Sequence, residues 1–363
     1  MNARGTAADL DGRVERLRAQ MRDEAVTTLV VFDPRNIRYL TGFTGSSGVV
    51  VVGPEETLLV SDFRYRLQAR EEAPQARFVE IADPLSDVLP DLLPAEGGIG
   101  IEATRLTVAE WKKLEPGLAA RPVRLVDGWV ERLREIKSPA EIAAVKAAAE
   151  IVTGMLEHLT GMRVVGRSER DVALELEIWA RRQGSEPVPF PLIVAAGPRG
   201  AMPHAEVTDR PIQAGQLLVV DIGAAVDGYA ADVTRTFATG PLGTRELEIY
   251  ETVARAQRSA REAAKAGIGC AELDAQARRT IAEAGYGESF KHSLGHGVGL
   301  DVHEGPRLSA RSEEVLAAGM VVTIEPGIYV EGLGGVRIED TVVVTAGGAD
   351  VLSMFPHSLI TLV

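Results

Sequence analysis

Two acidic residues stand at positions in the second half of the chain where an ionised side chain is costly unless it is paired or bound to a metal. Asp221 follows the apolar run Leu217–Val220, which is typical of a buried strand, and Asp232 comes shortly after it. Between the two acids lies the dipeptide Asp227-Gly228, a strong signal for a two-residue β-hairpin turn. This spacing predicts that both acids lie on one hairpin.

The turn also predicts how the two strands pair. If Asp227 and Gly228 occupy the turn, Asp221 lies opposite Thr234, and Asp232 is the diagonal neighbour of Asp221 on the same face. Diagonal neighbours have backbones about 7–8 Å apart, so two such carboxylates can converge on one metal centre. A one-residue bulge would move the acids to opposite faces.

The same arrangement recurs towards the end of the chain. Val321–Glu325 is a second apolar strand that ends in an acid, glycines around Gly332 supply a turn, and the chain returns through Val336–Asp340. A turn centred near Gly332 places Glu325 almost opposite Glu339. Carboxylates grouped in a dry site repel one another, and metal ions are the usual remedy.

The histidines complete a set of metal ligands. Four of the six lie in informative contexts, namely His204, His292, His296 and His303. The best ligand assembly is Asp221, Asp232, His296, Glu325 and Glu339. Its four carboxylates balance two divalent cations, and this oxygen-rich set suits Mn²⁺ best, with Co²⁺, Zn²⁺ or Fe²⁺ as alternatives. Two such ions make a water nucleophilic near neutral pH and polarise a carbonyl.

Alternating strands and helices precede this chemistry and predict an α/β domain over residues 1–135. Asp33-Pro34 is interpreted as a turn that ends the first strand, and Asp33–Ser47 as an ordinary loop. The predicted helices are Asp9–Glu24, Phe63–Ala73, Pro84–Leu93 and Val108–Leu114, and the predicted strands are Thr27–Phe32, Gly48–Val52, Thr57–Ser61, Arg77–Ile81 and Ile99–Glu102.

A second domain is predicted over residues 136–363. Ser138-Pro139-Ala140-Glu141 forms a capping box with proline in the first turn, and it starts a long helix towards Gly161. Ser168 with Asp171 starts another helix. Strands and glycine-rich turns follow, together with helices at Glu246–Ala266 and near Ala271–Ala284. The fold class as a whole is therefore α+β.

Composition restricts the partners and the compartment. The net charge of −13 and the lack of a Lys/Arg-rich stripe argue against nucleic acid. The longest apolar runs are far shorter than the ~20 residues of a membrane span. Met1–Leu10 has no apolar core of a signal peptide, and the single cysteine, Cys270, cannot form an internal disulfide. We expect a cytoplasmic protein with no nucleic-acid or membrane partner.

Position by position, these residues resemble the pita-bread metallopeptidases, which include methionine aminopeptidase, aminopeptidase P and prolidase. The resemblance covers residues 139–363. It implies a pita-bread catalytic domain preceded by a smaller creatinase-like α/β domain. The matching segments are the hairpin of Asp221 and Asp232, His296-Gly297-Val298-Gly299 with His303-Glu304, Thr323-Ile324-Glu325-Pro326-Gly327 and Arg337-Ile338-Glu339-Asp340.

The resemblance also implies roles for residues around the ligands. His204 and His303 are expected to bind the substrate's peptide group and stabilise the tetrahedral intermediate. Our mechanistic hypothesis adds Glu325 as the proton shuttle, first as general base and then as acid. His292 is expected to line the proline pocket. Arg307 either holds the free carboxylate of a dipeptide or is a solvated surface arginine. Tyr329 and Arg337 are expected to support the ligands and the substrate.

The N-terminal domain and the hinge Glu135–Pro139 resemble the proline-specific branch of this family. The implied activity is hydrolysis of the Xaa-Pro bond after the first residue, with a preference for dipeptides as in Xaa-Pro dipeptidase (prolidase). The alternatives are an aminopeptidase P that acts on longer peptides, a methionine aminopeptidase and a non-catalytic binding protein. The resemblance further implies a homodimer, with the N-terminal domain serving substrate access and dimerisation.

Overall fold

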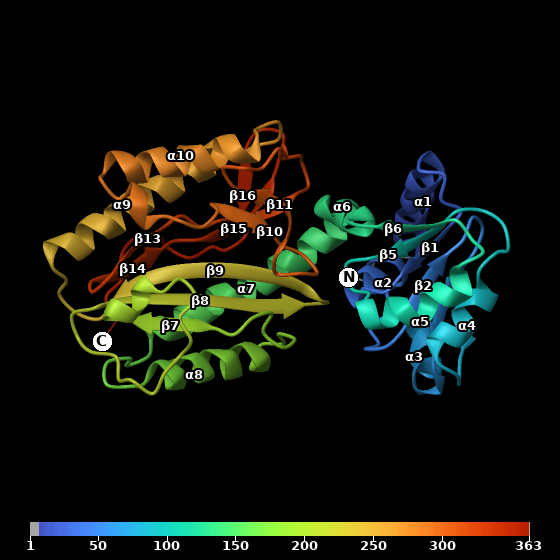
Figure 1. Cartoon of the computed structure of the whole chain (residues 1–363). Coiled ribbons are helices and arrows are strands. Elements are labelled where there is room, and N and C mark those ends of the chain that lie inside the picture. Colours follow the sequence, from blue (N-terminus) through green and yellow to red (C-terminus); the bar gives the residue numbers. More distant parts are fainter. Residues whose placement is uncertain (1–6, 363) are drawn as a thin grey trace. The chain divides into compact units, whose positions relative to one another are not determined.

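The computed structural model describes residues 7–362, and the chain forms two compact units, residues 7–134 and 135–362 (Figure 1). Residues 1–6, which begin the segment without a signal-peptide core, and residue 363 lie outside the described residues. No helix among the described residues is long and apolar enough to cross a membrane.

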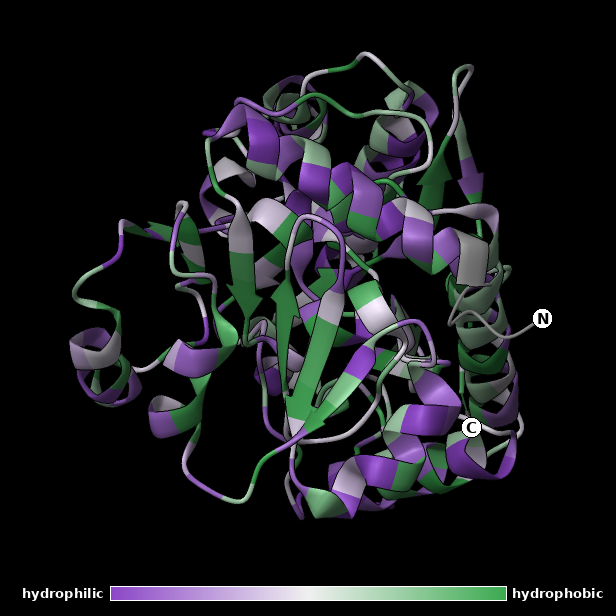
Figure 2. Cartoon of the chain, turned by 90° about the vertical axis from the view of Figure 1, so that its right-hand side faces the viewer, coloured by the Kyte–Doolittle hydropathy of each residue, from purple (hydrophilic) through white to green (hydrophobic). Residues whose placement is uncertain are grey.

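The N-terminal unit is an α/β fold around a six-stranded sheet of order β4-β3-β2-β1-β5-β6, in which only β2 runs antiparallel to its neighbours. Its strands are largely hydrophobic, whereas its helices mix hydrophobic and hydrophilic residues (Figure 2). The strands are β1 (Thr28–Val31), β2 (Val49–Val52), β3 (Thr57–Ser61), β4 (Arg77–Glu80), β5 (Ile99–Glu102) and β6 (Val123–Val126). The helices are α1 (Ala7–Asp23), α2 (Pro34–Thr41), η1 (Phe63–Tyr65), α3 (Arg66–Glu72), α4 (Leu85–Leu92), α5 (Val108–Leu118) and α6 (Trp129–Glu135), the last of which ends at the boundary of the units.

Helix α2 corrects the prediction made for Asp33–Ser47. Asp33 does not end the first strand with a turn. Its side chain accepts a hydrogen bond from the Arg35 amide (2.7 Å) and caps the helix, and Pro34 occupies the first helical turn. Ile37 and Leu40 are buried against the rest of the unit. The interpretation of this segment as a turn and loop was therefore wrong.

A cavity of about 630 Å³ opens at the end of this sheet where β1 and β3 finish. Phe32, Asp62 and Arg105 are among the residues that line it. None of the predicted site residues lies there, because all of them belong to residues 135–362.

The second unit surrounds a long hairpin with helices (Figure 1). Helix α7 packs against β8 and β9, α8 against β7, and α9 against α10. The helices are α7 (Pro139–Thr160), α8 (Glu169–Arg182), η2 (Gly197–Ala201), α9 (Thr244–Ala263), α10 (Cys270–Glu283) and η3 (Gly287–Ser289). The strands are β7 (Ile193–Ala196), β8 (Leu217–Val226), β9 (Tyr229–Ala238), β10 (Gly295–Gly297), β11 (Glu304–Leu308), β12 (Val321–Ile324), β13 (Gly327–Val330), β14 (Gly334–Arg337), β15 (Asp340–Val344) and β16 (Ala349–Val351).

The predicted register of the β8–β9 hairpin is confirmed. Asp221 pairs with Thr234, and Asp232 pairs with Gly223. The turn residues Asp227 and Gly228 both have positive φ angles, 48° and 77°. Two consecutive positive φ angles match a type I′ turn, whose twist suits a two-residue hairpin.

The second acidic pair also follows the predicted register, but on an interrupted hairpin. Ile324 pairs with Asp340 and Gly327 with Arg337, so both ladders are symmetric about Gly332. Glu325 and Glu339 lie opposite each other between the ladders. The continuous strand expected for Val321–Glu325 stops before Glu325, because Pro326 has no amide proton to donate to a ladder.

Candidate metal centre

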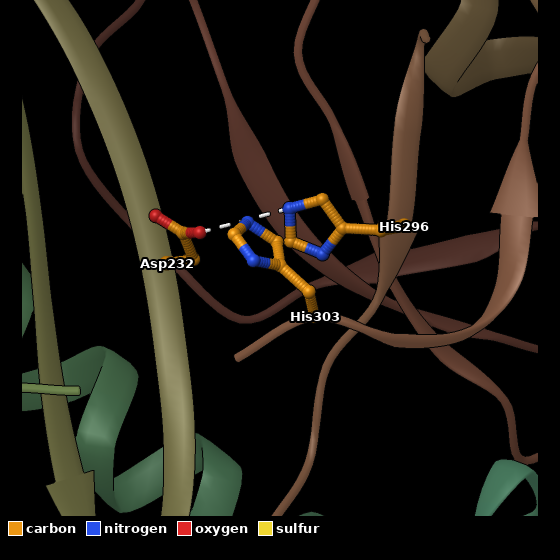
Figure 3. Close-up of side chains that lie close together, drawn as sticks. All are labelled: Asp232, His296 and His303. Atoms are coloured by element: carbon orange, nitrogen blue, oxygen red, sulfur yellow. Dashed lines mark ion pairs between the residues drawn. The ribbon is translucent and has the colours of Figure 1, made fainter. Parts of the chain in front are cut away.

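The structure brings all five predicted ligands together, from β8, β9, β10 and the connections beside β12 and β14. Their donor atoms form three overlapping groups, each with all atoms within 4.8 Å of one another. The groups are Asp232 with His296 and His303, His296 with Glu325 and Glu339, and Asp221 with Asp232 and Glu339. Figure 3 shows the first group, in which the side chains of Asp232, His296 and His303 point toward one another.

Three of the four carboxylates of this cluster are buried, and each of the three has an oxygen without a hydrogen-bond donor. Asp221, Asp232 and Glu339 are 9%, 5% and 1% exposed. Asp221 Oδ1, Asp232 Oδ1 and Glu339 Oε1 are fully buried and have no hydrogen-bond partner among the described residues. Burial, followed by the neighbouring acids, raises the pKa values of Asp232 and Glu339 well above their usual range. A bound cation would therefore stabilise the ionised form of these acids.

His296 is oriented as a ligand by its own backbone neighbour. Its Nδ1 lies 3.0 Å from the Gly297 carbonyl, which can only accept, so Nδ1 carries the proton and Nε2 faces the acids. Nε2 is 3.2 Å from Glu325 Oε1 and 3.8 Å from Asp232 Oδ2. Burial would raise the pKa of Glu325, but the hydrogen bond and charge of His296 outweigh it and lower that pKa to about 2.

Arg337 holds the cluster from the outside. Its buried guanidinium donates to Asp221 Oδ2 (2.6 Å), to the Tyr329 hydroxyl (2.8 Å) and to Thr234 Oγ1 (2.9 Å). Thr234 Oγ1 in turn donates to Glu339 Oε2 (2.6 Å). One arginine therefore orients a carboxylate from each hairpin.

These residues fit two divalent cations. Three buried carboxylate oxygens without hydrogen-bond partners, an imidazole nitrogen turned towards them and a predominance of oxygen donors match a hard or borderline metal. No cysteine takes part, which distinguishes the cluster from a structural thiolate zinc site.

The other predicted histidines lie around the cluster. The rings of His303 and His296 are 4.3 Å apart, and burial together with His296 lowers the pKa of His303, which favours a neutral ring. His292 Nε2 is 3.0 Å from the Tyr329 hydroxyl, and burial lowers the pKa of His292. His204 is exposed on the segment that follows β7. The carbonyl of Pro203 accepts from Arg337 (3.3 Å), so this segment reaches the cluster.

Arg307 lies on β11 directly opposite His296 on β10. Directly opposite residues of an antiparallel pair share a face of the sheet. Arg307 is exposed, and its backbone amide donates to Glu314 Oε2 (3.0 Å). The exposed side chain of Arg307 is therefore on the same face of the sheet as that of His296.

Two threonines of the site were not predicted as site residues. Thr234 links Arg337 to Glu339 and is fully buried. Thr323 accepts from the His296 amide (3.1 Å) and donates to Glu325 Oε1 (3.1 Å). The available signal was the two-residue period of a strand, because Thr234 and Thr323 each lie two residues from a ligand and hence on the same face.

The chain matches two family models. The model described as metallopeptidase family M24 covers residues 143–346, and the one described as creatinase/prolidase N-terminal domain covers residues 13–136. An Xaa-Pro dipeptidase of Pyrococcus furiosus is 38% identical over 96% of this chain and 99% of its own length.

Solved structures agree with these matches. An Xaa-Pro dipeptidase from Bacillus anthracis superposes with a TM-score of 0.94 at 38% identity, over 97% of this chain and 100% of the other. An X-Pro aminopeptidase from Thermotoga maritima superposes with a TM-score of 0.87 at 35% identity, over 97% and 100%. The predicted fold, a pita-bread domain preceded by a creatinase-like α/β domain, is confirmed.

Proposed function

The chain belongs to metallopeptidase family M24, and from this premise we propose that it hydrolyses the bond between an N-terminal residue and proline, acting as an Xaa-Pro dipeptidase. The observation that carries the proposal is the convergence of four carboxylates and His296 from two hairpins and a third strand. Near-full-length similarity to a protein named Xaa-Pro dipeptidase supports the substrate class.

Asp221, Asp232, His296, Glu325 and Glu339 would hold two divalent cations, for which we propose Mn²⁺ because of the oxygen-rich donor set. When bound, the ions supply a nucleophilic water near neutral pH and polarise the scissile carbonyl. Arg337 keeps the carboxylate of Asp221 in place for this task.

The chain's own groups then move the protons and bind the substrate. Glu325, held by Thr323, takes a proton as general base and returns it to the leaving nitrogen of proline. His303 and His204 donate hydrogen bonds to the oxyanion and the peptide group. His292, fixed by Tyr329, lines the proline pocket.

Arg307 sets the preference for dipeptides in this proposal. Its exposed guanidinium lies on the strand beside His296 and would bind the free carboxylate of the proline residue. The second candidate is an Xaa-Pro aminopeptidase, which the similarity to the Thermotoga maritima enzyme favours.

We also propose roles for the two domains, an oligomeric state and a cellular compartment. Residues 1–135 would serve substrate access and dimerisation, residues 136–363 would form the catalytic domain, and the protein would act as a cytoplasmic homodimer. The match of residues 13–136 to the creatinase/prolidase N-terminal domain supports the first part.

The test compares Ala-Pro with Ala-Pro-Gly-Gly as substrates of the Mn²⁺-loaded enzyme. Cleavage of the dipeptide alone supports a dipeptidase, and cleavage of the tetrapeptide supports the aminopeptidase. Preferential cleavage of Met-Ala-Ser over Met-Pro would indicate a methionine aminopeptidase. Failure to bind divalent ions or cleave any peptide would indicate a binding protein.

A further inference from the structure

The segment that carries His204 is held at both ends by one buried carboxylate. Glu169, the first residue of α8, is 1% exposed. It accepts hydrogen bonds from the Ala196 amide (3.0 Å) at the end of β7 and from both the amide (3.1 Å) and the hydroxyl (2.7 Å) of Thr208. The two ends of the intervening segment, residues 197–207, are therefore drawn to the same point.

Arg199, which lies within the segment, adds an ion pair with Glu169 to these hydrogen bonds. Arg199 Nε lies 3.0 Å from Glu169 Oε2, and the guanidinium of Arg199 also donates to the carbonyl of Glu206. The ion pair is largely buried, with side-chain exposures of 18% for Arg199 and 1% for Glu169. Glu169 thus contacts the residues that flank the segment and, through Arg199, a residue close to its beginning.

The segment is joined to the metal centre through Arg337. Arg337 donates to the Pro203 carbonyl (3.3 Å) and to the carboxylate of Asp221 (2.6 Å). No hydrogen bond or ion pair connects the His204 ring to another described residue, and His204 is exposed. Its place beside the metal centre is therefore set by the backbone of its segment.

We propose that Glu169 is a positioning residue that acts through His204. This inference rests on the proposed function in one respect, namely that His204 contacts the substrate. An exposed histidine on a connecting segment can serve the reaction only if the backbone holds it in one place, because a displacement of about 1 Å can cost on the order of 100-fold in rate.

The carboxylate is suited to this task because it only accepts hydrogen bonds. Its partners are two amides, a hydroxyl and a guanidinium, which all donate. In Glu169→Gln, an NH₂ group replaces one acceptor oxygen. This group is itself a donor, so at least one of the donors around residue 169 loses its hydrogen bond. The isosteric substitution therefore loosens the segment without leaving a cavity.

A double-mutant cycle tests the proposal on the full Mn²⁺-loaded enzyme with Ala-Pro as substrate. We expect Glu169→Gln to lower kcat/KM by roughly 10- to 100-fold, mainly through kcat, with Mn²⁺ affinity by calorimetry unchanged. In a His204→Ala background, Glu169→Gln should have no further effect beyond about twofold. Additive losses, or a loss of Mn²⁺ affinity, would overturn the proposal.

Glu102→Gln is the matched control. Glu102 is likewise buried and accepts from the Phe32 amide (2.7 Å), the Asp33 amide (2.6 Å) and Asn36 (2.5 Å), but it lies in the N-terminal unit. The control should retain wild-type kcat. A loss in the control equal to that in Glu169→Gln would show a general effect of removing a buried acid, and it would overturn the proposal.

Hydrogen–deuterium exchange gives a readout that is independent of activity. Exchange across residues 196–208 should be faster in Glu169→Gln than in wild type and unchanged in Glu102→Gln. Unchanged exchange in Glu169→Gln refutes the anchoring role. If the proposed function itself is wrong, wild type will leave all Xaa-Pro peptides intact while the exchange result still stands. Should Glu169→Gln not fold, Thr208→Val removes one bond of the anchor and should shift rate and exchange in the same directions.

Discussion

Replacing Asp232 with asparagine should change thermal stability in opposite directions with and without metal. Asp232 belongs to two of the three donor groups, and its Oδ1 has no hydrogen-bond partner among the described residues. Asparagine keeps the size of the side chain and removes its charge. The variant therefore separates the repulsion among the acids from their affinity for cations.

The size of the effect follows from the geometry. Donor atoms of Asp221 and Glu339 lie within 4.8 Å of Asp232, and two charges at that distance repel by roughly 3 kcal/mol at an effective dielectric constant of about 20. Proton uptake relieves part of this, so we expect Asp232→Asn to stabilise the metal-free protein by about 1–3 kcal/mol. Each kcal/mol of added stability raises Tm by roughly 2–4 °C.

With Mn²⁺ the order should reverse. A ligand at 100 times its Kd stabilises the folded state by about 2.7 kcal/mol per site. The wild type gains this stabilisation. Asp232→Asn lacks one ligand in each of the two donor groups to which Asp232 belongs, so Mn²⁺ should stabilise the variant only slightly. Calorimetric melting at about pH 7.5 measures the repulsion among the acids in chelator and the stabilisation by bound metal in Mn²⁺.

The pH dependence provides a second check. The pKa of Asp232 is raised in the folded state, so its contribution to stability is present below its unfolded-state pKa and is lost as the pH rises through the folded-state pKa. Metal-free wild type should thus gain stability on mild acidification, and Asp232→Asn should gain less. Asp350→Asn, on the exposed part of β16, is the control and should change neither melting temperature.

If Asp232→Asn melts below wild type in chelator and keeps the full Mn²⁺ shift, Asp232 neither repels its neighbouring acids nor binds the metal.

Three further predictions concern the same unit. Glu325→Ala should lower kcat on Ala-Pro by roughly 10²- to 10⁴-fold, since it removes the proposed proton shuttle together with one proposed metal ligand. Wild-type turnover would exclude that role. Gly297→Ala should lower the melting temperature by several degrees and weaken Mn²⁺ binding, because its Cβ would come 1.9 Å from the Gly305 carbonyl oxygen beside His296. Gly347→Ala, with open space around the new methyl group, is its control and should melt like wild type. Burial raises the pKa of the Cys270 thiol to about 11, so a thiol reagent at about pH 8 should react with this cysteine only after unfolding. Prompt reaction of the native protein would contradict the burial of Cys270.

Local features of the sequence predicted much of the site. The Asp227-Gly228 turn determined the pairing of Asp221 with Thr234, because a two-residue turn leaves one register for its strands. Pairing symmetric about Gly332 likewise brought Glu325 opposite Glu339. Each relation spans few residues and depends on backbone geometry alone, so it can be worked out from the chain.

The prediction for Asp33-Pro34 shows where local reasoning fails. An Asp-Pro pair suits both a turn and the first turn of a helix. Helix α2 forms here because Ile37 and Leu40 find buried positions in the N-terminal unit. Packing against distant residues therefore decided between two locally acceptable structures.

Turns and strand periodicity in the sequence determined the two hairpins and the residues that each presents. That the two hairpins share one centre was inferred from the charge balance of their acids, but the contacts between them are visible only in the folded protein, where Arg337 and Thr234 join Asp221 to Glu339 across more than a hundred residues of chain. The tertiary structure also placed the His204 segment between Glu169 and Arg337. Hairpin pairing depends on backbone hydrogen bonds between residues that are near in sequence, whereas the approach of separate hairpins depends on the burial of side chains that are remote in sequence.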